Sequence, residues 1–226
     1  MVYYVAYRAL KGRNNPHIVH KLQTLGCKPI CKSFWEADNQ SIDVVIRVLQ
    51  GTFPIVLKRI REVKRPTFIK EICADFGSLT IVAYRVSKES DNKKGKIASL
   101  LRRAPYIRLC RGVYAFCQKP NSFDRNGILV DGRTFWEFIR KEIDEKAVIL
   151  SRVVIVNREA VKVLLEETKK RVENDIEAIV DGYKDIYERV VVGQLDKREA
   201  LKKAKKLKTR FLMVKKVAIF YEKWLR

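Results

Sequence analysis

Apolar residues in the first 157 positions recur in two blocks of similar order. Each block begins with a run rich in aromatic and β-branched residues, at positions 2–8 and 79–86, and such a run predicts a β-strand. A polar turn follows each run. Apolar residues then recur at helical spacing: Ile18, Val19, Leu22 and Leu25 in the first block, and Ile97, Leu100 and Leu101 in the second. Each block therefore opens with a predicted strand and helix.

The remainder of each block continues the same order. An alternating stretch predicts a second strand, at residues 30–34 and 107–113. A second helix and a final strand follow, at residues 41–49 and 55–63 in the first block and at 132–143 and 148–156 in the second. The order β-α-β and then α-β, with room for an extra hairpin strand, is typical of the ferredoxin-like fold. We therefore expect an α+β protein with two tandem ferredoxin-like domains.

Identical residues at matching places indicate that the two blocks arose by duplication. The tetrapeptide Val-Ala-Tyr-Arg ends at Arg8 and again at Arg85, and Cys31 matches Cys110 at a nearly equal offset. The difference in residue number between matching residues of the two blocks then stays constant until residues 118–133, where it grows. This stretch is rich in Pro, Asn, Gly and Asp and predicts a loop insertion. We place the repeats at residues 1–65 and 78–157, with a linker at 66–77.

Residues 158–226 have a different pattern, in which apolar positions recur every three or four residues on both sides of a short break. Gly193 predicts the end of one helix, and Asp196 with Glu199 resembles the capping box that starts another. The sequence therefore predicts a long antiparallel helical hairpin. Its second arm is strongly basic, with twelve basic and two acidic residues after position 196, whereas the first arm carries seven basic and nine acidic residues.

Charge narrows the classes of partner. The chain has 226 residues and a formal net charge of +22, which indicates a polyanionic partner, with nucleic acid first and an anionic membrane second. The charge could also serve only for solvation of the surface, as in heat-adapted proteins. Charged residues make up 33% of the chain and Gln is scarce, which favours a heat-adapted source. No signal peptide pattern or membrane-length apolar run occurs, so we expect a cytoplasmic protein with five reduced cysteines.

The strand that ends in Tyr and Arg, the basic helix and the next strand, "KSFWE" or "RGVYAF", resemble the small CRISPR-associated adaptation proteins. The same unit is similar to the PaaX and ChrB families, and a helical tail is similar to ChrB. This resemblance covers residues 1–157 and implies a ferredoxin-like fold with nucleic-acid association. In the CRISPR family an aspartate typically follows the tyrosine, and it is proposed to hold a metal for phosphodiester cleavage.

Arginine stands at both of these positions here, as Arg8 and Arg85. A guanidinium cannot ligate a cation, but its donors suit phosphate, so we expect both residues to contact nucleic acid. The alternative is an arginine that forms a salt bridge with a nearby glutamate. Further candidates flank helix starts or line the last helix: Lys11, Arg13, Lys93, Lys94, Lys96, Arg102, Arg103, Lys202, Lys205, Lys206, Lys208 and Arg210.

Catalytic and metal chemistry have weaker support. His17, His20, Cys27 and Cys31 are zinc-ligand types, but Cys31 matches Cys110 on a predicted core strand, so a buried cysteine is the better interpretation. No phosphate-binding loop or nucleophile motif occurs, and no carboxylate cluster stands out among the aspartates, which include Asp38, Asp43, Asp75, Asp124 and Asp131. We expect no cofactor and no metal.

Three functions stay open from the sequence. The first is a non-catalytic protein that binds nucleic acid, with double-stranded DNA ahead of RNA, as a regulator or a genome-defence accessory. The second is a metal-dependent nuclease with relocated carboxylates. The third is an assembly factor that forms a homodimer through the hairpin. The basic arm could also pair with the acidic arm or lie on lipid, but its apolar side faces its partner helix, so no membrane partner is expected.

Overall fold

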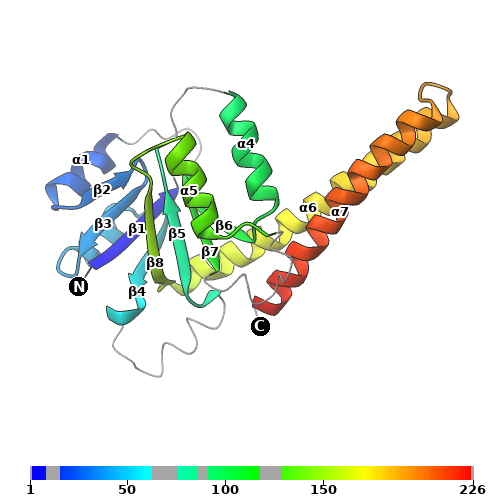
Figure 1. Cartoon of the computed structure of the whole chain (residues 1–226). Coiled ribbons are helices and arrows are strands. Elements are labelled where there is room, and N and C mark those ends of the chain that lie inside the picture. The colour runs from blue at the N-terminus through cyan, green and yellow to red at the C-terminus, as the bar shows by residue number, and fades with distance from the viewer. Residues whose placement is uncertain (1, 9–15, 63–75, 86–90, 118–128, 225–226) are drawn as a thin grey trace.

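The computed structural model describes residues 2–8, 16–62, 76–85, 91–117 and 129–224. These residues form a mixed α+β structure with one eight-stranded antiparallel sheet, six α-helices and a long C-terminal helical region (Figure 1). Helices cover the sheet, and the two longest helices extend away from it. None of the helices in these ranges combines the length and the hydropathy needed to span a bilayer.

The first half of the sheet has the strand order β2-β3-β1-β4. Its elements are β1 (Val2–Arg8), α1 (Pro16–Thr24), β2 (Lys28–Cys31), β3 (Phe34–Asp38), α2 (Ile42–Val48) and β4 (Phe53–Arg59), followed by a 3₁₀ turn (Ile60–Glu62). The second half has the order β6-β7-β5-β8. Its elements are β5 (Leu79–Ala83), α4 (Asp91–Arg102), β6 (Tyr106–Cys110), β7 (Val113–Cys117), α5 (Gly132–Glu142) and β8 (Val148–Ile155). Antiparallel pairing of β4 with β8 joins the halves.

Strand registers agree between the halves around Ala6 and Ala83. Ala6 pairs with Phe34 and Ile55 in the first half, and Ala83 pairs with Val113 and Val148 in the second. An irregularity interrupts the β2–β3 ladder before Cys31, and an equivalent one interrupts the β6–β7 ladder before Cys110. These pairs reproduce the offsets between the two blocks of the sequence.

The sheet curves so strongly that β1 contacts β6, five places away in the strand order. The inner face holds one core to which both halves contribute, including Phe34, Leu57, Ile81 and Leu109. Separate apolar clusters lie on the outer face, where α1 and α2 cover the first half and α4 and α5 cover the second. The amphipathic pattern of each helix thus buries its apolar side against one half of the sheet.

The helical hairpin consists of α6 (Arg158–Val191) and α7 (Lys197–Trp224). The first turns of α6 bury Ala160, Val161 and Leu164 in the inner core. Asn157, directly before α6, uses its side chain to accept a bond from the Val56 amide and to donate one to the Pro54 carbonyl. This bonding anchors the start of α6 to β4. Figure 1 shows the far half of the hairpin extending beyond the sheet and its covering helices.

Several element boundaries differ from the expectation. The single strand expected at 30–34 is wrong: β2 ends at Cys31, a turn follows, and β3 starts at Phe34. This tight hairpin lets both Cys31 and Phe34 point into the inner core. The last strand of the first half, β4, ends at Arg59 rather than at residue 63, because the chain enters the 3₁₀ turn. Most of the expected linker, residues 66–75, lies outside the described residues.

Candidate nucleic-acid interface

A cleft separates α4 from the hairpin, and basic side chains line both of its walls. Its outer part is a cavity of about 440 Å³ bordered by Arg102 at the end of α4, by Arg103 directly after it, and by Lys206 and Arg210 of α7. An inner cavity of about 400 Å³ continues from it toward the sheet edge, and the two cavities share Arg102, Asp175, Arg210 and Val214. The cleft therefore joins two basic segments that lie about a hundred residues apart in sequence.

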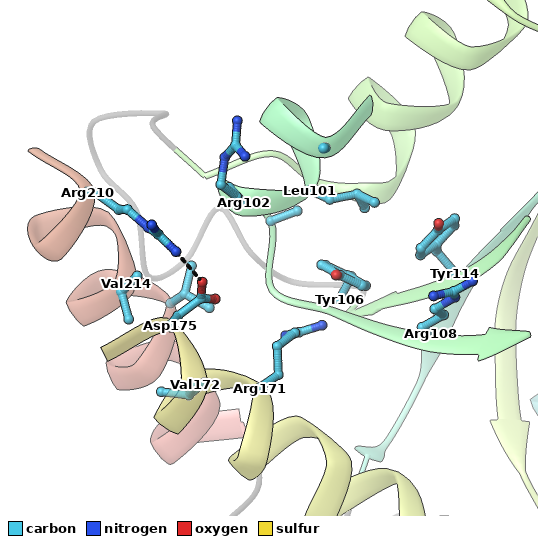
Figure 2. Close-up of a pocket in the computed structure, with 13 residues that line it drawn as sticks. Leu101, Arg102, Tyr106, Arg108, Tyr114, Arg171, Val172, Asp175, Arg210 and Val214 are labelled. Atoms are coloured by element: carbon cyan, nitrogen blue, oxygen red, sulfur yellow. Dashed lines mark hydrogen bonds and ion pairs between the residues drawn. The ribbon is translucent and has the colours of Figure 1, made fainter. Parts of the chain in front are cut away.

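The inner cavity adds side chains from the edge of the sheet and from α6 (Figure 2). Tyr106 and Arg108 come from β6, Tyr114 comes from β7, and Arg171 comes from α6. The alternation of β6 places Tyr106 and Arg108 on the same face of the sheet, away from the buried Ile107 and Leu109. The edge of the sheet is thereby part of the cleft.

Arg171 is held in place by two aromatic residues. Its Cζ lies 3.9 Å from the centroid of the Tyr106 ring, and its guanidinium donates a hydrogen bond to the Tyr221 hydroxyl. Burial raises the pKa of Tyr221 to about 12, so the protonated phenol donates to the Tyr106 carbonyl at 2.6 Å. These contacts fix the guanidinium at the wall of the cavity.

Arg210 and Asp175 form an ion pair across the hairpin, with 3.0 Å between the guanidinium nitrogen and the carboxylate oxygen. The Nε of Arg210 is buried and has no hydrogen-bond partner. Among the described residues that line the two cavities, six are basic and Asp175 is the one carboxylate. The cleft therefore keeps a large excess of positive charge.

Four of the residues predicted from sequence thus meet at this cleft: Arg102, Arg103, Lys206 and Arg210. The other predicted lysines of α4 and α7 are exposed on the same two helices, outside the cavities: Lys93, Lys94, Lys96, Lys202, Lys205 and Lys208. Lys11 and Arg13 lie outside the described residues. Sequence reasoning missed Tyr106, Arg108 and Arg171, because their contribution depends on how the hairpin packs against the sheet edge.

Arg8 does not line either cavity, and its side chain contacts β6 and α6. Its Nε donates to the Leu109 carbonyl at 2.6 Å, a terminal nitrogen donates to the Arg108 carbonyl, and the other pairs with Glu167 at 2.5 Å. Its Cζ also lies 5.6 Å from the centroid of the Phe53 ring. This arrangement matches the salt-bridge alternative, and a phosphate contact by Arg8 stays a prediction.

Arg85 occupies the matching position in the second half, but it is exposed. Its amide donates to Asp144 Oδ2 at 2.8 Å. Burial raises the pKa of Cys31 and of Cys110, while the positive charge of Arg85 opposes the shift at Cys31 and that of Arg8 opposes the shift at Cys110. Each arginine thus lies near the matching cysteine of the other half.

Within the described ranges, no three His, Cys, Asp or Glu side chains gather as ligands for a metal ion. Asp38 accepts bonds from the amides of Gln40 and Ser41, and Asp131 caps α5 by accepting from the Thr134 amide. Cys27 and Cys31 are buried in apolar clusters, whereas His17 and His20 are exposed. Asp75 and Asp124 lie outside the described residues.

Comparison of the chain with protein-family models, with curated proteins and with solved structures found no match. The resemblance to the CRISPR-associated, PaaX and ChrB proteins therefore stays a prediction, and the cleft itself is the main guide to function.

Proposed function

We propose that the protein binds nucleic acid without cleaving it and that the cleft between α4 and α7 is the binding surface. The observation that carries this proposal is the meeting of Arg102 and Arg103 with Lys206 and Arg210, against one carboxylate. Arginine donors match phosphate oxygens in geometry, and contacts to phosphates supply most of sequence-independent affinity. Double-stranded DNA is the first candidate, with its backbone along α7 and the exposed lysines beside it.

A duplicated ferredoxin-like unit is the fold that we propose to carry this surface. It is supported by the equal strand orders of the two halves and by the equal registers at Ala6 and Ala83. In this arrangement only the second half faces the hairpin at the cleft, so the duplication produces one binding surface and not two.

The test measures binding of duplex DNA, single-stranded DNA and duplex RNA, each about 20 nucleotides long, by fluorescence anisotropy at increasing salt. Replacing Arg102, Arg103 and Lys206 together with alanine should weaken binding roughly tenfold or more and reduce the salt slope by about 2 to 3. The matched control replaces Lys28, Lys32 and Lys146, which are exposed and do not line the cleft.

We expect the control variant to lose little affinity, because its lysines lie away from the proposed surface. Equal losses in the two variants would contradict the cleft as the surface. Absence of binding to all three nucleic acids at about 50 mM salt would contradict the function itself.

A further inference from the structure

We propose that the inner cavity binds the terminal phosphate of a nucleotide, either at the end of a nucleic-acid strand or in a free nucleoside monophosphate. This inference rests on the proposed function, and it names the chemical group that the innermost part of the cleft recognises. The volume is the first argument. A cavity of about 400 Å³ is in the range of small-molecule sites and holds one nucleotide, but not a duplex.

Charge is the second argument. No carboxylate within the described ranges pairs with Arg102, Arg108 or Arg171, while Arg210 already neutralises Asp175. A terminal phosphate carries a charge of about −1.5 to −2 near neutral pH, as phosphorylated side chains do. A phosphodiester carries one negative charge. Three uncompensated guanidinium groups therefore favour the terminal group over an internal phosphate.

Arrangement of the walls is the third argument. Figure 2 shows Arg171 pointing toward Tyr106, and the contacts with Tyr106 and Tyr221 hold it there before any ligand arrives. The Nε of Arg210 is buried with its donor unused. Val172, Val214 and Val217 supply an apolar wall for a sugar or a base. Pre-set donors beside an apolar wall are typical of a built ligand site.

The experiment compares duplexes of one sequence that end in a 5′-phosphate, a 3′-phosphate or hydroxyl groups, and adds inorganic phosphate, adenosine monophosphate and adenosine as competitors. We expect a phosphorylated end to bind about tenfold more tightly than a hydroxyl end, which corresponds to 1.4 kcal/mol. Adenosine monophosphate and inorganic phosphate should compete, and adenosine should not.

Two variants separate the inner cavity from the rest of the cleft. Arg108→Gln should remove the preference for phosphorylated ends, because it should weaken binding of phosphorylated duplex more than binding of hydroxyl-ended duplex. Lys206→Gln, in the outer cavity only, should weaken both ends equally.

Duplex binding with no preference for a phosphorylated end, and no competition by adenosine monophosphate, would overturn this inference and leave the proposed function standing. Binding of adenosine monophosphate that Arg108→Gln abolishes, without any duplex binding, would support the cavity and overturn the nucleic-acid function.

A second inference comes from the apolar surface of the hairpin and does not depend on the cleft. Of fourteen exposed large hydrophobic residues in the described part of the chain, twelve lie in residues 158–224. Tyr187 and Val191 are the most exposed of these twelve, at 71% and 69%. Monomeric proteins seldom expose large continuous apolar patches, so the arrangement of these residues on the hairpin decides what they do.

Helical spacing places six of these residues on one face. Asp175, Ile179, Gly182 and Ile186 of α6 turn toward α7, and the exposed residues Ile176, Val180, Tyr183 and Tyr187 each follow one of them directly. In α7 the exposed Leu201 and Phe211 likewise follow the inward Ala200 and Arg210, and the basic Lys208 between them follows the inward Leu207. One step along an α-helix rotates the side-chain direction by 100° about the helix axis. Because α6 and α7 are antiparallel, the residue after each inward residue lies on the same side of the hairpin in both helices. We call this surface the apolar hairpin face.

We infer that a second copy of the chain covers the apolar hairpin face and forms a four-helix bundle. In such a bundle each helix has two neighbours about 90° apart, which fits two apolar seams separated by one residue. Charge pairing is available in such a bundle, because the arm at 158–192 carries nine acidic residues and the arm at 197–226 carries twelve basic residues. A two-fold pairing brings the acidic arm of one copy against the basic arm of the other.

The available area is large enough. Residues 176–191 span about 24 Å, and two packed helices are about 20 Å wide, so each copy offers about 500 Å². The pair would bury about 1,000 Å², which reaches the size of a specific interface. The outer cavity of the cleft lies on the opposite side, because Lys206 and Met213 directly precede the inward Leu207 and Val214. Dimerisation therefore leaves both clefts open.

Light scattering after gel filtration tests this inference over a range of micromolar concentrations. The wild-type chain should be a dimer, and Val180→Glu with Tyr187→Glu should be a folded monomer by circular dichroism. The matched control is Leu212→Glu with Ile219→Glu, since these residues are exposed to a similar degree but lie on another side of α7. A monomeric wild-type chain, or a control that dissociates equally, would overturn the dimer.

Discussion

At the scale of single residues, identical sequence does not give identical contacts. Arg8 and Arg85 end the same tetrapeptide, but Arg8 is tied to β6 and α6 whereas Arg85 is exposed. The difference arises because α6 brings Glu167 to the first arginine. The repeated tetrapeptide predicts one role for both residues, whereas their tertiary contacts differ.

Replacing Arg8 with alanine should lower the free energy of unfolding by about 2 kcal/mol, since the carbonyls of Leu109 and Arg108 lose a charged donor and Glu167 loses its partner. Arg85→Ala should cost less than about 0.5 kcal/mol, because the bond to Asp144 comes from the backbone and survives. Urea unfolding followed by circular dichroism measures both values. Equal costs would contradict the described difference between the two arginines.

At the scale of elements, the hydrophobic pattern predicted the order of strands and helices correctly, but it predicted several strand boundaries wrongly. The pattern could not separate β2 from β3, because alternation continues through the short turn at residues 32–33. The last strands of the two halves also differ. β8 has eight residues where β4 has seven, and Arg152 adopts a positive φ of 57° within an irregular stretch of the β5–β8 ladder. Such local departures depend on the neighbouring strand.

At the scale of the whole molecule, the two halves share one sheet and one inner core. Leu57 of β4 pairs with Ile155 of β8, and Phe34 and Leu109 lie in the same cluster. The hairpin adds to this body, because the Trp224 indole donates to the Phe76 carbonyl at 2.8 Å. A core to which all parts contribute favours a single cooperative transition.

Three tryptophans can test this cooperativity, since Trp35 lies in the first half, Trp136 in the second and Trp224 in the hairpin. Variants that keep one tryptophan and replace the other two with phenylalanine should show the same urea midpoint as circular dichroism of that variant. A fluorescence transition that precedes loss of the helical signal in any variant would show that the part around its tryptophan unfolds separately.

The basic surface is the part of the candidate site that could be predicted from sequence. Helix patterns and local charge predict Arg102, Arg103, Lys206 and Arg210, because both patterns are properties of neighbouring residues. The sequence does not predict Arg108 and Arg171, because their place at the cavity depends on contacts between β6 and α6. The choice of one cleft among many basic residues also needed those contacts.

The sequence alone determined the duplicated order of elements, the helical hairpin and the excess of positive charge, since periodicity and composition are local quantities. Only the tertiary structure decided that the halves curve into one sheet, that Arg8 has partners and Arg85 is exposed, and that α4 and α7 enclose an arginine-lined cleft. Those outcomes depend on which distant surfaces bury their apolar faces together, and packing of this kind is a property of the whole chain.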